Sequence, residues 1–227
     1  MTQHYVITRS YYGPEWDRES NWRRLKITQA VAPMMRRQGV KFTWLGLLDN
    51  RDPFLEERMR LFDQVVIWQP KGVSTRKSAA DHTPDWDYLG TPTEPTLQTR
   101  LDDDDALACD GLARVQKAAA GLAHRTILVL PEGIRVFAGT YEPMTLETNA
   151  MQTLFTPPGD KLSVYDYGHH EAASIAPVLI VDRQPGWLYV RHRDSISGEN
   201  MHPGIPIDRH IRSLFPIDWH ALESAWA

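Results

Sequence analysis

Short apolar runs alternate with longer amphipathic stretches in the first part of the chain. The runs lie at residues 4–9, 42–48 and 65–68, and each has the length of a strand buried on both faces. Residues 20–38 carry apolar side chains at helical spacings and end before Gly39, and Asp52 followed by Pro53 is typical of the start of a helix. This alternation predicts an α/β fold with a mainly parallel sheet flanked by helices, whose ligands bind at the carboxyl ends of the strands.

Beyond residue 68 the pattern becomes less regular. Residues 70–96 contain several prolines and glycines without a period, which predicts a long surface loop. Residues 97–101 have the pattern of a fourth strand, which runs directly into four consecutive aspartates. Apolar residues from Leu107 to Leu122 then recur at helical spacings, so a further helix is expected there.

The second half of the chain predicts short strands. Residues 126–130 and 134–138 flank the turn-like Pro131-Glu132-Gly133, which predicts an antiparallel hairpin. Later candidate strands lie at residues 162–165, 178–181 and 187–191. We therefore expect one domain over residues 1–227, with an α/β half at 1–123 and a mixed or antiparallel half at 124–227.

Charge and composition exclude several classes of partner. The formal net charge is −4, and no sustained basic stripe with interleaved aromatics is present, so general nucleic-acid binding is not expected. The chain lacks a secretory leader and any apolar run long enough to cross a bilayer. With its single cysteine, Cys109, this predicts a cytoplasmic protein without a transmembrane segment, and peripheral membrane contact stays open.

The four aspartates, Asp102 to Asp105, are the strongest chemical signal. Adjacent carboxylates repel one another, so a positive partner is expected, and Mg²⁺ or Mn²⁺ suits oxygen ligands that are shared with a diphosphate. In an extended chain Asp102 and Asp104 point to one side and Asp103 and Asp105 to the other. Arg100 is placed to hold a phosphate or a ribose. Alternatively, Asp104 or Asp105 caps the following helix.

The aspartate run also carries a family resemblance. Residues 99–107, TRLDDDDAL, resemble the DxD-bearing stretch of GT-A glycosyltransferases, and especially of the rhamnosyltransferase family. Residues 6–9, 42–49 and 187–192 resemble that family's opening strand, its second strand with a terminal acid, and its late strand ending in histidine. The sequence Arg193-Asp194-Ser195 departs from the family's usual continuation, which leaves the sugar and the acceptor open.

The resemblance implies a GT-A-like, Rossmann-type sheet in which residues 1–123 bind a nucleotide-sugar and residues 124–227 bind the acceptor. It implies a metal site for Mn²⁺ or Mg²⁺ at Asp102, Asp104 and His192, although His192 may equally be an ordinary histidine at a strand end. The implied nucleotide-sugar contacts are Arg9, Asp49, Arg100, Asp102 and Asp103. The implied reaction moves a sugar, rhamnose by analogy, from a nucleoside diphosphate to a hydroxyl acceptor on a glycan, lipid or protein.

An inverting transferase also needs a base within hydrogen-bond reach of the acceptor hydroxyl. Asp166, His170 and Glu171 are candidates, because they follow a predicted strand closely and Gly168 allows a sharp turn between them. Two other functions remain open from the sequence. One is a nucleotidyltransferase or metal-dependent phosphohydrolase that uses the same acidic cluster, and the other is an inactive binding or assembly protein with this fold.

Overall fold

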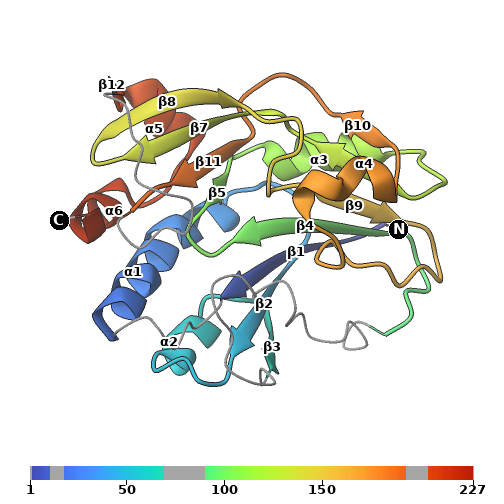
Figure 1. Ribbon diagram of the computed structural model, residues 1–227, viewed down its shortest axis with the longest axis horizontal. Helices are drawn as coiled ribbons and strands as arrows, with labels where there is room; N and C mark the ends of the chain where they lie inside the picture. The colour runs from blue at the N-terminus through green and yellow to red at the C-terminus, as the bar shows by residue number, and fades with distance from the viewer. Residues whose placement is uncertain (1, 11–17, 69–89, 193–203, 227) are drawn as a thin grey trace.

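The computed structural model describes residues 2–10, 18–68, 90–192 and 204–226, and it contains two sheets (Figure 1). The larger sheet has seven strands in the order β10-β6-β9-β4-β1-β2-β3. Their bounds are β1 Gln3–Ser10, β2 Thr43–Asp49, β3 Gln64–Trp68, β4 Thr96–Asp102, β6 Thr126–Val129, β9 Thr153–Thr156 and β10 Val178–Ile180. Within this sheet every pairing is parallel except the two made by β9. The predicted mainly parallel sheet is therefore confirmed.

The smaller sheet has five strands in the order β12-β8-β7-β11-β5, with parallel and antiparallel pairings. Its strands are β5 Ala106–Leu107, β7 Glu132–Phe137, β8 Thr140–Thr145, β11 Trp187–Val190 and β12 Ile205–Pro206. The predicted mixed sheet in the C-terminal part is thus present. Each sheet takes strands from both sides of residue 123, because β6, β9 and β10 extend the larger sheet and β5 joins the smaller one.

Helices and turns cover both faces of the larger sheet. The helices are α1 Arg18–Met35, α2 Leu55–Met59, α3 Gly111–Ala119, α4 Ala172–Ile175, α5 Arg209–Leu214 and α6 Trp219–Trp226, and the 3₁₀ helix η3 His169–Glu171 precedes α4. Neighbouring residues of β1 enter different cores: Val6 packs in the cluster that includes α1, and Ile7 packs in the cluster on the other face. A strand buried on both faces explains the nearly continuous apolar runs in the sequence.

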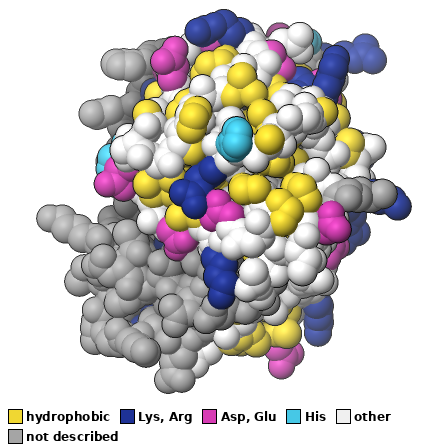
Figure 2. All heavy atoms as spheres, turned by 90° about the vertical axis from the view of Figure 1, so that its right-hand side faces the viewer, with side chains coloured by type: hydrophobic (Ala, Val, Ile, Leu, Met, Phe, Trp, Pro, Cys, Tyr) yellow, Lys and Arg dark blue, Asp and Glu magenta, His cyan; other side chains and the backbone are white. Residues whose placement is uncertain are grey.

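Figure 2 shows the side of the molecule where β1 and β4 begin, and its Lys and Arg side chains lie in small separate groups rather than in a stripe. None of the helices in the described part of the chain is both long and apolar enough to span a bilayer.

The predicted hairpin at residues 126–138 is wrong. β6 and β7 belong to different sheets, so Pro131 connects the sheets instead of turning one strand back on itself. The hairpin lies one strand later, between β7 and β8, where Ala138 and Gly139 both have positive φ. Two successive residues with positive φ are typical of a tight hairpin turn whose twist matches the strands it joins.

The predicted strand at residues 162–165 is also wrong. This segment forms turns, because side chains bond to the nearby backbone: Asp166 accepts from the Ser163 N–H at 2.7 Å, and the Ser163 hydroxyl accepts from the Tyr165 N–H at 3.2 Å. The helix expected from Leu107 begins only at Gly111, since β5 comes first, and the helix expected from Asp52 is the short α2. The predicted loop at 70–96 lies mostly outside the described residues.

A chain of polar groups crosses the buried part of the larger sheet. His4 is 3% exposed, with Nε2 lying 2.8 Å from Thr99 Oγ1 and Nδ1 lying 3.0 Å from Gln116 Nε2. Because the Gln116 amide N–H donates, His4 Nδ1 accepts and its Nε2–H donates, which requires a neutral ring. Burial lowers the pKa of His4 to about 4.

Stability is expected to fall on mild acidification because of His4. Its folded pKa lies below the value of about 6.5 for an unfolded chain, so between pH 6.5 and 4 the unfolded state binds the extra proton and the free energy of unfolding falls by up to about 3 kcal/mol. Urea unfolding at pH 7.5 and pH 4.5 tests this, with His4→Gln as the control that cannot titrate. An equal loss of stability in the wild type and in the variant would rule out His4 as the cause.

Candidate active site

The parallel strands β1, β2 and β4 end at one edge of the larger sheet. In the register of β1 and β4, Arg9 lies opposite Asp102 and Ile7 lies opposite Arg100. Because side chains alternate along a strand, Arg9, Arg100 and Asp102 share one face of the sheet at this edge. The structure therefore brings together three of the residues predicted to contact a nucleotide-sugar.

The chain turns immediately after Asp102, since the Asp105 N–H donates to the Asp102 carbonyl at 3.2 Å. Burial alternates along the aspartate run: Asp103 and Asp105 are buried, while Asp102 and Asp104 are partly exposed. The expected division of the four carboxylates into two sides is thus seen in their burial, although the backbone is a turn rather than an extended strand.

Asp103 is the centre of a buried ion-pair network. Its Oδ1 accepts from Arg24 Nη2 at 2.6 Å, and its Oδ2 accepts from Ser10 Oγ at 2.9 Å and from Arg58 Nη1 at 3.3 Å. Arg58 also donates to Asp52 at 2.5 Å. This network connects α1, α2 and the ends of β1 and β4. Both oxygens of Asp103 are therefore engaged by protein donors rather than directed at an open site.

Asp104 lies against His192, which directly follows β11. Asp104 Oδ2 is 3.0 Å from His192 Nε2 and 3.8 Å from Arg24 Nη1. Burial raises the pKa of Asp104, but the hydrogen bond from His192 and the charge of Arg24 outweigh it, so the net shift is downward. Asp104 is thus held as a carboxylate, and two residues predicted as metal ligands lie side by side.

Asp105 connects the aspartate turn to the smaller sheet. Its Oδ1 accepts from the Val190 N–H at 3.0 Å, two residues before His192. Burial, followed by the charges of Asp104 and Asp102, raises the pKa of Asp105 well above its ordinary value. The suggestion that Asp104 or Asp105 caps the next helix is wrong, because α3 begins at Gly111 directly after Asp110.

Two guanidinium groups stack on a single aromatic ring beside Asp102. The Cζ atoms of Arg9 and Arg100 lie 5.2 Å and 4.9 Å from the centroid of the Tyr165 ring, and Tyr165 donates to the Ile7 carbonyl at 3.0 Å. Burial raises the pKa of Tyr165 to about 12, so the ring carries no charge of its own. Arg100 Nε is 3.6 Å from Asp102 Oδ1. Guanidinium donors clustered in this way suit a diphosphate.

Asp49 ends β2, and β1 separates this strand from β4. The Asp49 carboxylate is fully buried and accepts from Arg51 Nε at 2.9 Å and Arg51 Nη2 at 2.6 Å. This bidentate pair fixes the loop that follows β2. Asp49 is therefore at the expected edge of the sheet but not beside the aspartate run.

The segment predicted to carry the base faces solvent at all three predicted positions. Asp166, His170 and Glu171 are exposed; Asp166 accepts from Ser163 N–H, and Glu171 accepts from Gly168 N–H at 2.8 Å. These carboxylates mainly hold the turn together.

His169, which sequence reasoning did not single out from its neighbour His170, is the half-buried imidazole of this segment. Its carbonyl accepts from Gln152 Nε2 at 2.6 Å. Burial, followed by the charges of Arg100 and His170, lowers the pKa of His169, and the charge of Asp102 acts in the opposite direction. His169 is thus within electrostatic reach of the sheet edge.

Sequence reasoning also missed Arg24 and Arg58, although a pattern in the sequence around Arg24 could have identified it. Ser20, Arg24 and Thr28 recur every fourth residue along α1 and are all buried, and Thr28 donates to the Arg24 carbonyl at 2.8 Å. A polar stripe at helical spacing predicts a helix face that packs against charged groups. Arg58 had no comparable pattern, because two of its partners, Thr28 and Asp103, lie 30 and 45 residues away along the chain.

No three His, Cys, Asp or Glu side chains in the described part of the chain converge closely enough to hold a metal ion by themselves. Asp104 and His192 lie in hydrogen-bond contact as a pair, and Asp102 begins the turn that carries Asp104.

A family model described as "Putative rhamnosyl transferase" matches residues 33–203. No curated protein matches the chain significantly. Among solved structures the chain is similar to S. aureus TarS 1-349, at 9% identity and a TM-score of 0.47, covering 83% of this chain and 60% of that one. It is also similar to 4-diphosphocytidyl-2C-methyl-D-erythritol synthase, at 14% identity and a TM-score of 0.42, covering 79% and 89% of the two chains.

The chain spans less than two thirds of that TarS structure, and 37% of a longer TarS structure to which it is similar at 11% identity and a TM-score of 0.46. The family model, in contrast, covers well over half of the present chain, including β2, the aspartate run and His192. The chain therefore belongs to this family of glycosyltransferases, the one described as "Putative rhamnosyl transferase".

Proposed function

We propose that the protein is a metal-dependent glycosyltransferase that moves a sugar, rhamnose by family analogy, from a nucleoside diphosphate to a hydroxyl acceptor. The family match supports sugar transfer from a nucleotide-sugar. The observation that carries the metal dependence is the 3.0 Å approach of Asp104 to His192, beside Asp102 at the carboxyl edge of the parallel strands. Ligands of such sheets bind at this edge.

The donor set fits a divalent cation that is shared with substrate. Mg²⁺ is usually held by one or two carboxylates together with substrate phosphates, so a complete protein cage is not required. The imidazole of His192 favours Mn²⁺ over Mg²⁺, because nitrogen is a softer ligand than oxygen. When bound, the cation would supply positive charge to the departing diphosphate.

Arg9 and Arg100 are assigned to the diphosphate. Both lie on the same sheet face as Asp102, and both guanidinium groups contact the Tyr165 ring, which limits where they can move. Fixed donors stabilise negative charge that develops on a leaving group without reorganising during the reaction. Asp49 retains its proposed place near the nucleotide base, and Asp103 positions Arg24 and the turn.

His169 is the base that the geometry favours within the segment that also carries Asp166, His170 and Glu171. Its lowered pKa keeps the ring neutral at pH 7, as proton acceptance from an acceptor hydroxyl requires. The three neighbours are exposed, and two of them already accept backbone hydrogen bonds.

Replacing the proposed base and replacing its neighbour should lower kcat by very different amounts. His169→Gln should lower kcat by about 10²–10⁴-fold, whereas His170→Gln should change it less than about fivefold. Because the pKa of His169 is lowered, the apparent pKa of the acid limb of the wild-type pH–rate profile should lie below the ordinary histidine value. Steady-state kinetics on both variants test this, and equal losses in the two would reject the assignment.

The reaction class is tested with UDP-, GDP- and dTDP-sugars, each with and without Mn²⁺, by calorimetry and by product analysis. A transferase should bind one nucleotide tightly only with metal, and should release nucleoside diphosphate when an acceptor is added. Rapid hydrolysis without an acceptor would instead indicate a phosphohydrolase. Failure to bind any member of the panel would indicate a binding or assembly protein.

A further inference from the structure

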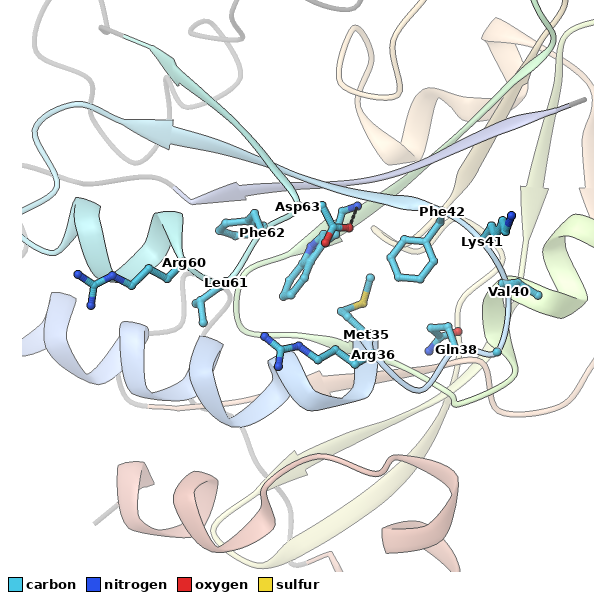
Figure 3. Close-up of a pocket in the computed structure, with 12 residues that line it drawn as sticks. Met35, Arg36, Gln38, Val40, Lys41, Phe42, Arg60, Leu61, Phe62 and Asp63 are labelled. Atoms are coloured by element: carbon cyan, nitrogen blue, oxygen red, sulfur yellow. Dashed lines mark hydrogen bonds between the residues drawn. The ribbon is translucent and has the colours of Figure 1, made fainter.

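A cavity lies where β2 and β3 begin, at the end of these strands opposite to Asp49. It has a volume of about 470 Å³ and is bounded by the end of α1, the start of β2 and the segment between α2 and β3 (Figure 3). β2 runs from this cavity to Asp49, and seven extended residues span about 20 Å. The cavity is therefore separate from the aspartate site.

One wall of this cavity is built from aromatic and aliphatic side chains. The rings of Trp44 and Phe62 meet edge to face at 4.7 Å, with Phe42, Leu61 and Met35 around them. Trp44 is held at both ends, since its indole N–H donates to Thr8 Oγ1 at 2.9 Å and its backbone N–H donates to Asp63 at 2.8 Å.

Gly46 and Gln38 fix the positions of other residues around the cavity. A Cβ on Gly46 would lie 2.6 Å from the Phe62 ring, so only glycine allows the ring to lie where it does. Buried Gln38 donates to the Ala108 carbonyl at 2.9 Å and accepts from the Leu112 N–H at 3.1 Å, which ties the end of α1 to α3. The cavity thus exists before any ligand arrives, as most small-molecule sites do.

The rim is basic. Arg36, Lys41 and Arg60 are exposed, line the cavity and make no ion pair with any described residue. Asp63 is the one acidic side chain among the lining residues, and one of its oxygens accepts the Trp44 N–H. Figure 3 shows the three cationic side chains apart from one another, on the segments after α2, after α1 and before β2. In a chain of net charge −4, this concentration of cations makes a local positive field.

We propose that this cavity is a binding site for a small organic anion that has an aromatic or aliphatic body and one acidic group. The body would lie against the aromatic wall, and the acidic group would lie at the rim. The volume is within the usual range of ligand sites, which combine apolar surface with a few polar or charged groups. A hollow accepts an inserted group, whereas a membrane surface would need apolar side chains that protrude.

The fluorescent aryl sulfonate 8-anilinonaphthalene-1-sulfonate is a suitable probe. The wild type should bind one equivalent with a blue-shifted emission, and Arg36→Glu/Arg60→Glu should weaken that binding at least tenfold. The matched control is Arg37→Glu/Arg209→Glu, which changes the net charge equally at exposed residues outside the cavity and should change binding less than threefold.

Neutral N-phenyl-1-naphthylamine, which lacks the sulfonate, should bind both double variants alike. Leu61→Trp, which fills the cavity, should abolish binding of both probes.

Competition separates this cavity from the aspartate site. Excess UDP, GDP or dTDP with Mn²⁺ should leave the bound sulfonate in place, whether or not the proposed transfer reaction is correct. Displacement by any of these nucleotides, equal weakening in both charge-reversed variants, or absence of stoichiometric binding in the folded wild type would each overturn the proposal.

Discussion

Asp103→Asn is expected to lower the free energy of unfolding by about 3–5 kcal/mol, a large share of the stability of a domain of this size. The carboxylate is 2% exposed and accepts from Arg24, Arg58 and Ser10. Removing its charge leaves two buried guanidiniums with less compensation, and an uncompensated buried charge is costly. Urea unfolding monitored by tryptophan fluorescence measures the change.

The matched control for this prediction is Asp102→Asn. Asp102 is partly exposed, and Arg100 Nε lies 3.6 Å from its Oδ1, so the free energy of unfolding should change by less than about 1 kcal/mol. Similar losses in both variants would mean that Asp103 does not organise the edge of the sheet. A stable Asp103→Asn protein would lead to the same conclusion.

The aspartate run shows what one sequence can and cannot reveal about a site. Clustered negative charge at a strand end was visible, and so was the need for positive partners. Which carboxylate meets which cation was not visible, because Arg24 and Arg58 lie 79 and 45 residues away from Asp103 along the chain. In the structure Asp103 is buried in the ion-pair network and Asp105 bonds to β11. Asp102 and Asp104 are the two partly exposed carboxylates.

The fold was most predictable where burial on both faces leaves continuous apolar runs. β1 and β2 were found for that reason. The edge strand β3 and the more polar β4 were also found, and the bounds of all four strands differ from the predicted ones by at most one residue. β9 was missed because it has only four residues and lacks a period, although its insertion between β4 and β6 joins the two halves of the sheet. The hairpin error arose because a turn sequence does not say whether the next strand returns to the same sheet.

The sequence also could not identify which residue of the segment 166–171 is the candidate base. Exposed carboxylates and two adjacent histidines looked equivalent in the sequence, whereas the turn directs His169 inward and leaves His170 exposed. The Gln152 side chain, directly before β9, donates to the His169 carbonyl from 17 residues away along the chain, a contact with no local sequence signature.

Asp104→Asn is expected to abolish metal-dependent nucleotide binding and to lower kcat by about 10²–10³-fold, while the fold survives. The amide is nearly isosteric with the carboxylate and keeps an oxygen that can accept from His192. Arg24 lies 3.8 Å from Asp104 but keeps its 2.6 Å bond to Asp103, so the loss of unfolding free energy should be smaller than for Asp103→Asn. The amide cannot supply the negative charge that a hard divalent cation requires. Calorimetry with the preferred nucleotide, with and without Mn²⁺, measures the binding change.

His192→Gln supplies the second arm of this experiment. If Asp104 and His192 hold one ion, the two single variants and the double variant should lose similar amounts of metal-dependent affinity, because removing either ligand already empties the site. If the pair is only a structural hydrogen bond, the losses should appear in the free energy of unfolding, and Mn²⁺-dependent binding should persist in all three proteins. Asp103→Asn gives the opposite pattern, with lowered stability but with metal-dependent binding retained by the molecules that remain folded, so the two aspartates can be assigned separately.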